Sequence, residues 1–256
     1  MKNTEEKPTD MREFVMGDLH GNLYGLLECL EKVKFNYEKD RLIQLGDVVD
    51  RFPHSKEVVD ELLKIKNLIS IKGNHDDWFL HWLNTGTHPT NFKGSGAEAT
   101  LESYSRGING NLTPDKVPAN HIMFFKNQLP YLYLNGKVFV HGGYNRHFDL
   151  FNQPTEDIFW WDRDLWGAAL SRELMSPLIK HTSTFNLGKN IKEVYIGHTP
   201  TINYREIKPM YASGIWNLDT GGGYLEGRVS IMNLITREVV QSQKNNILYR
   251  NEYKAY

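Results

Sequence analysis

The chain has 256 residues, of which 30 are Lys or Arg and 31 are Asp or Glu, so its formal net charge is −1. With 40% hydrophobic and 24% charged residues, its composition is that of a globular protein and excludes a disordered or fibrous chain. The balanced charge argues against nucleic acid as a partner, and no apolar run approaches the ~18 residues that a membrane span needs.

The length favours one large domain with a sizeable core. Cys29 is the single cysteine, which excludes an intrachain disulfide and favours a reducing compartment. Residues 1–11 are polar and lack the apolar middle of a signal peptide. We therefore expect a cytoplasmic protein with no membrane association.

The first third of the chain alternates between two patterns. Apolar runs over 12–16, 42–45 and 68–71 predict buried strands, and helix-spaced apolar residues over 23–33 and 58–65 separate them. This order is β-α-β-α-β, which is typical of parallel strands joined by crossover helices.

The rest of the chain reads differently. Residues 84–120 are rich in Gly, Asn, Thr, Ser and Pro, which predicts loops and short helices in an insertion over 84–128. Asn135-Gly136 between two apolar runs predicts a tight hairpin ending in a strand over 137–140. Further predicted strands, mostly antiparallel in the last third, lie at 193–196, 202–207, 215–218, 229–235 and 238–242.

Polar loops with Gly and ionisable residues follow five of these strands. In order they read GDLHG, GDVVDR, GNHD, HGG and GHT. Loops at the carboxyl ends of parallel strands form the ligand crevice of open α/β sheets. Their convergence would gather six side chains that can bind metal, namely Asp18, His20, Asp47, Asn74, His141 and His198.

This set of side chains suits a metal centre. Carboxylate, carboxamide and imidazole groups, with no thiolate, favour manganese, iron or zinc over a soft metal. Six ligands are too many for one catalytic ion with an open position, but they suit two ions that share a bridging carboxylate. For a single motif, an ordinary turn residue would be the better interpretation; the ordered set of five makes that interpretation improbable.

The five motifs, in this order, resemble those of the calcineurin-like metallophosphoesterase superfamily, and more narrowly the bacterial and phage serine/threonine phosphoprotein phosphatases. The similarity extends to ATLESY, WDRDLW and LDTGGG and covers about residues 12–235. It implies an α/β fold: a β-sandwich of two mixed sheets flanked by helices, in four α-β-β-α layers. The resemblance places the active site in loops at the carboxyl ends of the strands.

The resemblance also implies roles. Asp18, His20 and Asp47 would hold a first metal, with Asp47 bridging. Asn74, His141 and His198 would complete a second, and a metal-bridging hydroxide would attack phosphorus in line.

By the same resemblance, His75 would be the general acid and Asp50 the carboxylate that keeps it protonated. Arg51 would clamp the phosphate, and Arg163 is the candidate for a second phosphate-binding arginine. The resemblance departs at Phe52, where the family often has Gly, so a bulky side chain is expected to narrow or reshape the cleft beside Arg51. Trp160, Trp161 and Trp166 are expected in the core.

The predicted function is a dinuclear metal-dependent phosphomonoesterase acting on phosphoserine, phosphothreonine or phosphotyrosine in proteins. The alternative is a small-molecule phosphohydrolase, such as a symmetrical diadenosine tetraphosphate hydrolase or a 2′,3′-cyclic nucleotide phosphodiesterase. A catalytically dead binding module is disfavoured because every ligand and the general acid are present. The cofactors would be two divalent ions, with manganese preferred over iron or zinc.

The predicted catalytic domain covers 12–243, with the insertion at 84–128. Residues 1–11 and 244–256 are predicted to be peripheral tails. Oligomeric state is left open by the sequence.

Overall fold

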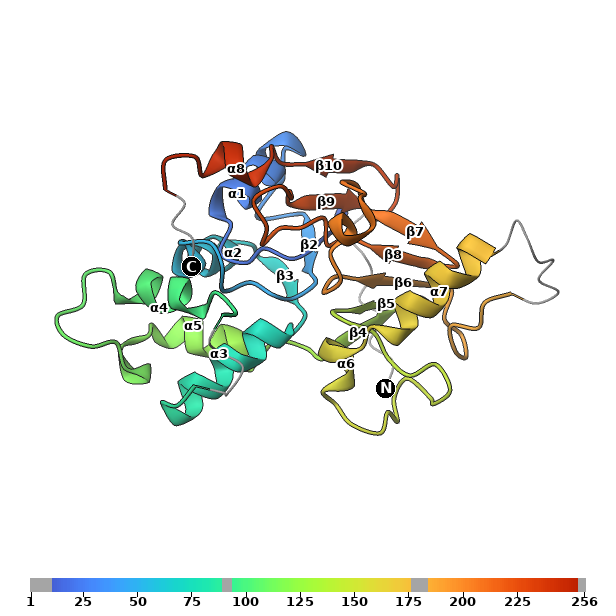
Figure 1. Cartoon of the computed structure of the whole chain (residues 1–256), viewed down its shortest axis with the longest axis horizontal. Helices are drawn as coiled ribbons and strands as arrows, with labels where there is room; N and C mark the ends of the chain where they lie inside the picture. Colours follow the sequence, from blue (N-terminus) through green and yellow to red (C-terminus); the bar gives the residue numbers. More distant parts are fainter. Residues whose placement is uncertain (1–10, 89–93, 176–183, 253–256) are drawn as a thin grey trace.

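The computed structural model describes residues 11–88, 94–175 and 184–252 of the chain. Two five-stranded β-sheets form its centre (Figure 1). The first sheet contains β1 (Glu13–Met16), β2 (Arg41–Gln44), β3 (Asn67–Ser70), β9 (Ser230–Asn233) and β10 (Val239–Gln241). The second contains β4 (Tyr131–Leu134), β5 (Lys137–Val140), β6 (Glu193–Ile196), β7 (Met210–Ala212) and β8 (Ile215–Asn217).

The first sheet has the order β10-β9-β1-β2-β3. Strands β1, β2 and β3 are parallel, and α1 (Leu23–Lys32) and α2 (Ser55–Leu62) connect them. This is the predicted β-α-β-α-β unit. The late strands β9 and β10 add to its β1 edge in antiparallel pairs, so the first and last strands of the described chain lie in one sheet.

The second sheet has the order β4-β5-β6-β8-β7. Strands β4 and β5 form the predicted hairpin, whose turn residues Asn135 and Gly136 have φ of 53° and 80°. Two successive positive φ values match the twist of the flanking strands, which is why an Asn-Gly pair suits this turn. The prediction of a mostly antiparallel last third holds for β7, β9 and β10, whereas β8 pairs in parallel with β6.

Apolar layers bury both faces of each sheet. Between the sheets lies a core that includes Val15, Ile43, Phe139 and Tyr195. A second core joins the outer face of the first sheet to its helices, and a third joins the second sheet to α6 (Ile158–Trp161) and α7 (Asp164–Met175). The fold is therefore the expected four-layer α-β-β-α sandwich.

The segment after β3 is helical and packs on the first sheet's helices. It comprises α3 (Asn74–Thr85), α4 (Ala97–Ser105), the short 3-10 helix η2 (Pro114–Lys116) and α5 (Ala119–Lys126). Short helices within the predicted insertion agree with its composition. Apolar residues such as Tyr104 and Phe125 join the core, which is why hydrophobic residues continue through this Gly- and Pro-rich stretch.

One predicted strand is wrong. Residues 202–207 form the end of a 3-10 helix, η3 (Thr201–Tyr204), and a following loop. Pro200 lies at the start of this helix and Arg205, at φ 61°, ends it. The apolar side chains of Tyr204 and Ile207 are exposed, so this segment has no buried face that would hold it in a sheet.

The end of the described chain packs into the molecule. Helix α8 (Asn245–Leu248) follows β10, and the side chains of Asn245 and Tyr249 are fully buried. This segment falls within the predicted peripheral tail 244–256. Of the other predicted tail, 1–11, only Met11 lies within the described residues. The domain limits stay a prediction.

None of the helices in the described part of the chain is long and apolar enough to cross a membrane.

Candidate metal centre

The six predicted metal ligands converge at one edge of the sandwich. Five lie in loops that follow β1, β2, β5 and β6, and Asn74, after β3, is the first residue of α3. The first sheet supplies four of them and the second supplies two. All six are buried: Asp18, His20, Asp47, Asn74, His141 and His198.

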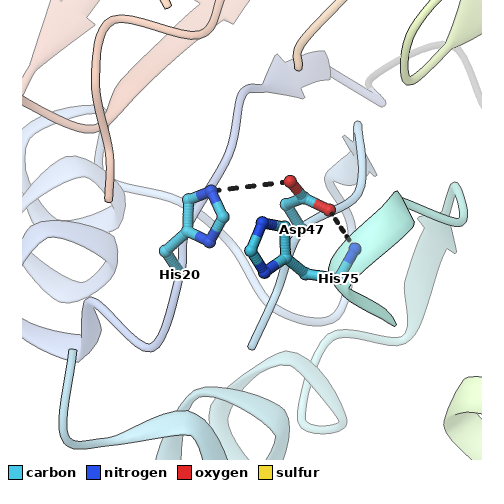
Figure 2. Close-up of side chains that lie close together, drawn as sticks. All are labelled: His20, Asp47 and His75. Atoms are coloured by element: carbon cyan, nitrogen blue, oxygen red, sulfur yellow. Dashed lines mark hydrogen bonds and ion pairs between the residues drawn. The ribbon is translucent and has the colours of Figure 1, made fainter. Parts of the chain in front are cut away.

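Asp47 lies at the middle of this group. Its Oδ2 is 3.5 Å from His20 Nε2 and 3.3 Å from His141 Nε2. Its Oδ1 accepts a hydrogen bond from the backbone N–H of His75 at 3.0 Å, as Figure 2 shows. Burial opposes the charged carboxylate, but the neighbouring His141 and His75 outweigh it and hold the pKa of Asp47 well below its ordinary value.

Backbone carbonyls orient two of the imidazoles. His20 Nδ1 lies 3.0 Å from the Val49 carbonyl and His141 Nδ1 lies 2.7 Å from the Leu45 carbonyl. If each Nδ1–H donates to its carbonyl, each Nε2 is left as a lone pair that faces the Asp47 carboxylate. This is the usual preparation of a metal-ligating histidine.

His198 carries the clearest sign of an intended ligand. Its Nε2 is buried and has no hydrogen-bond partner, which is costly for a polar nitrogen. Burial, together with the adjacent His141, lowers the pKa of His198 to about 2, so its ring is neutral and able to donate a lone pair.

The donor atoms fall into two groups that share one carboxylate. Asp47 belongs with His20 and His75 in one, and with His141 and His198 in the other; within each group the ligand atoms lie within 4.8 Å of one another. The residues thus fit two divalent cations joined by Asp47.

Asp18 supports the same conclusion. It accepts the backbone N–H of His198 at 3.2 Å, and burial, then the charges of Asp219 and Asp47, raise its pKa well above its ordinary value. Several carboxylates buried this close repel one another unless cations lie between them.

The backbone at the centre is tightly constrained. A Cβ atom on Gly73 would overlap Asp47, and one on Gly197 would overlap Asp18, so both close approaches require glycine. Five non-glycine residues of the candidate site also have positive φ, a costly conformation that is common at functional sites. They are His20, Asp47, Asp50, Arg51 and His198.

The predicted acid pair is in contact. His75 Nδ1 lies 2.6 Å from Asp50 Oδ2. Burial disfavours the imidazolium, but the charge of Asp47 and the bond to Asp50 outweigh it and raise the pKa of His75. Thr100 Oγ1 donates to the other Asp50 oxygen at 2.7 Å; the ATLESY motif was the only sequence signal for this residue.

The two predicted phosphate-binding arginines lie in different surroundings. The Arg51 guanidinium is 4.5 Å from the centre of the Tyr224 ring, and both residues line a cavity of about 310 Å³ with Gly96 and Gly223. Arg163 is exposed at the start of α7, and its charge contributes to the lowered pKa of His198. Arg163 therefore lies within electrostatic reach of the second donor group.

The expectation for Phe52 is corrected. Its side chain is buried, with its ring 4.6 Å from that of Tyr249, so it does not narrow the cleft. The expected core placement holds for Trp160 and Trp166, but Trp161 is 36% exposed.

The residues that hold the loops of the site in place were not predicted from the sequence. Asp76 accepts backbone N–H groups from Val48 and Gly73 and a side-chain bond from Gln128, which ties the loops after β2 and β3 together. Asn245 binds the glycine-rich loop of LDTGGG from the far end of the chain. Only the bond from Gly73, three residues before Asp76, is local. The other partners are 23 to 52 residues apart in sequence, so no local pattern marks them.

Comparisons with known proteins agree with this geometry. A family model described as calcineurin-like phosphoesterase matches residues 11–238. A symmetrical bis(5′-nucleosyl)-tetraphosphatase of Coxiella burnetii (strain Dugway 5J108-111) is 39% identical over 67 residues, which is 26% of this chain and 23% of that enzyme. The matched segment thus spans about a quarter of the curated relative.

Two solved structures share the fold. One, described as a proposed diadenosine tetraphosphatase, has a TM-score of 0.59 at 18% identity and covers 90% of this chain and 92% of its own. The other, a metallophosphoesterase from Sphaerobacter thermophilus, has a TM-score of 0.54 at 17% identity, with coverages of 94% and 93%.

Proposed function

Because the chain belongs to the calcineurin-like phosphoesterase family, we propose that it is a dinuclear metal-dependent phosphomonoesterase. The observation that carries this proposal is the shared carboxylate: Asp47 belongs to both groups of donor atoms. A bridging ligand of this kind suits two ions held close together on one phosphate.

In this proposal Asp18, His20 and Asp47 hold one ion, and Asn74, His141 and His198 complete the other around Asp47. When bound, the two ions supply positive charge for the phosphoryl oxygens and lower the pKa of bound water to give the nucleophile. The protein's contribution is to fix the donors before substrate arrives. Buried imidazoles whose Nδ1 faces a carbonyl do this because their rings cannot rotate freely.

The remaining roles concern the substrate. His75 donates a proton to the leaving oxygen, and Asp50 holds the imidazolium in place and favours its charged form. Arg51 binds two phosphate oxygens through its planar guanidinium, and Arg163 is the second phosphate-binding arginine.

The proposed substrates are phosphorylated proteins, at phosphoserine, phosphothreonine or phosphotyrosine. Support comes from the motifs shared with phosphoprotein phosphatases. A second candidate, symmetrical cleavage of a dinucleoside tetraphosphate, is favoured by the 67-residue match to the Coxiella burnetii enzyme. Neither candidate calls for a nucleic-acid or membrane partner.

We propose manganese as the working ion, with iron and zinc as alternatives, because the donors are nitrogen and oxygen atoms. A cytoplasmic location is proposed on the buried, unpaired Cys29.

The proposal predicts that hydrolysis of p-nitrophenyl phosphate requires added manganese or a similar divalent ion. The purified protein would be stripped with chelator, assayed, reloaded and assayed again. Activity should disappear on chelation and return on reloading. Activity that survives complete chelation, with metal content checked by elemental analysis, contradicts the dinuclear site.

A further inference from the structure

Two tryptophans stand beside the metal centre and have no part in the proposed chemistry. Trp78 lies on α3, which follows the first sheet, and Trp161 ends α6, which covers the second. Their ring centres are 5.4 Å apart. The pair therefore connects α3, beside the first sheet, to α6, beside the second; Figure 1 shows these two helices next to each other.

The pair is anchored at both ends to residues of the site. The Trp78 ring is 4.9 Å from the His75 ring, in an edge-on arrangement. The Trp161 ring is 6.0 Å from the His198 ring, also edge-on. Trp78 and Trp161, called the aromatic wall below, therefore extend from the proposed general acid His75 to His198 in the second group of metal ligands.

Packing does not account for these two positions. Trp161 is 36% exposed and Trp78 is partly buried, whereas the adjacent Trp160 and Trp166 are 5% and 0% exposed. The core of this half of the molecule is thus complete without Trp161. A partly exposed tryptophan pair at the edge of a reaction site offers a flat apolar surface to a ligand.

The position of His75 indicates what this surface meets. A general acid must lie within hydrogen-bond reach of the leaving oxygen, about 2.6–3.2 Å. The substrate group bonded to the leaving oxygen then lies next to His75. Trp78 is the residue of the aromatic wall whose ring contacts His75, so it is the one that this group would meet first. In an aryl phosphate the leaving oxygen is bonded directly to a planar ring, which is then close enough to pack against an indole.

Other substrates fit this position less well. The leaving oxygen of phosphoserine carries only a methylene group and then the peptide backbone. In a nucleotide, a ribose separates the oxygen from the base, which moves the base well beyond the residue adjacent to the acid.

We propose that Trp78 and Trp161 bind the aromatic ring of an aryl phosphate monoester, and that the preferred substrate is phosphotyrosine. This inference rests on the proposed function, because it takes His75 as the acid and a phosphomonoester as the substrate. It narrows the three phosphoamino acids of that proposal to one.

The test compares two peptides of identical sequence that carry either phosphotyrosine or phosphoserine. For manganese-loaded Trp78→Leu and Trp161→Leu, kcat/KM on the phosphotyrosine peptide should fall by about 3- to 10-fold, the size of an aromatic contact. The value on the phosphoserine peptide should stay within twofold. The two peptides differ in the reactivity of their leaving groups. The ratio of their kcat/KM values is therefore compared between the wild-type protein and each variant, which cancels that difference. Phe148→Leu, an exposed aromatic residue outside this wall, serves as the matched control and should change neither value.

A binding measurement makes the result independent of turnover. Phenylphosphonate carries a phenyl group on phosphorus where methylphosphonate carries a methyl group. Neither is hydrolysed, because a P–C bond replaces the ester bond. Calorimetric titration should show phenylphosphonate binding several-fold tighter to the wild-type protein, and Trp78→Leu should remove that difference. Circular dichroism and the Tm of each variant establish that it is folded.

The outcomes separate the two proposals. If the wild-type protein hydrolyses the phosphoserine peptide but the ratio of the two peptides does not change in either tryptophan variant, the ring subsite is refuted and the phosphatase stands. Equal losses on both peptides assign the tryptophans a structural role and also refute the subsite. Selective loss of dinucleoside tetraphosphate hydrolysis would assign the surface to a nucleobase instead. A metal-loaded wild-type protein that hydrolyses no phosphomonoester overturns both proposals.

Discussion

At the scale of single residues, the site depends on side chains that are buried and yet left with unused bonding capacity. His198 Nε2 has no hydrogen-bond partner, and Asp18 is buried close enough to Asp219 and Asp47 for their charges to raise its pKa. A buried polar atom normally finds a hydrogen bond during folding. Unused capacity of this kind indicates that the sequence is selected for a ligand and not for stability alone.

His75 is distinguishable from the proposed ligands by its contacts. Its Nδ1 is bound to Asp50, and its own backbone N–H holds Asp47. We expect His75→Asn to lower kcat on phenyl phosphate by about 10²–10⁴-fold, the usual contribution of a general acid. Manganese content, measured by elemental analysis, should stay at two ions per chain.

His147→Asn is the matched control, because His147 is exposed outside the site, and its activity should be unchanged. Loss of one metal ion in His75→Asn would instead make His75 a ligand, which its place beside His20 and Asp47 allows geometrically.

The contact between His75 and Asp50 predicts how kcat depends on pH. The raised pKa of His75 keeps the acid protonated at a higher pH than an ordinary histidine. Asp50→Asn removes one cause of that rise, so the alkaline limb of the kcat profile should move to lower pH. If the alkaline limb stays at the same pH in Asp50→Asn, a group other than His75 causes it.

At the scale of elements, loops far apart in sequence hold one another in place. The side-chain amide of Asn245 in α8 donates to the carbonyls of Gly221, Gly222 and Tyr224 at 3.1, 3.0 and 2.8 Å. Tyr224 in turn lies under the Arg51 guanidinium. The last helix of the described chain thus supports the residue that is proposed to bind phosphate.

This arrangement predicts the effect of Asn245→Ala. Three carbonyls would each lose one donor but keep another, so the cost is that of ordinary hydrogen bonds, about 0.5–1.5 kcal/mol of stability for each bond lost. KM for p-nitrophenyl phosphate should rise several-fold as Arg51 loses its support, while kcat changes less. Steady-state kinetics and the Tm would be measured together.

The neighbouring Asn246 provides a control of the same residue type. Its side chain binds the exposed Glu226, so Asn246→Ala should leave KM unchanged. A lower Tm with an unchanged KM in Asn245→Ala would show that α8 stabilises the fold but does not position Arg51.

At the scale of the whole molecule, the candidate centre joins the two sheets. Asp18, His20, Asp47 and Asn74 follow strands of the first sheet, and His141 and His198 follow strands of the second. Apolar packing between the sheets brings these loops together. Bound ions would then add a second, polar connection between the halves.

Metal binding should therefore stabilise the whole protein. Manganese at about 100 times its Kd adds about 2.7 kcal/mol for each site, which corresponds to a rise in Tm of about 5–10 °C per site for a chain of this size. Asp47→Asn should abolish most of this rise in a calorimetric scan, because Asp47 serves both donor groups.

Asp115→Asn, which changes an exposed carboxylate, should keep the full rise. A wild-type Tm that is indifferent to manganese, iron and zinc would argue against a preformed dinuclear site.

By itself, the sequence determined the features that depend on local order. Alternating apolar runs and helix-spaced residues predicted the first parallel strands, and Asn135-Gly136 predicted the hairpin. The convergence of the six proposed ligands was predicted because each lies a few residues after the end of a strand, so a short motif and its strand specify their place.

Only the tertiary structure decided the features that depend on distant partners. Residues 202–207 have strand-like composition but no face to bury, and so they form a 3-10 helix and a loop. The contacts of Phe52 with Tyr249, of Tyr224 with Arg51 and of Trp78 with Trp161 join segments far apart in the chain. Such pairs arise from how the two sheets and their helices pack, and that packing has no local signature in the sequence.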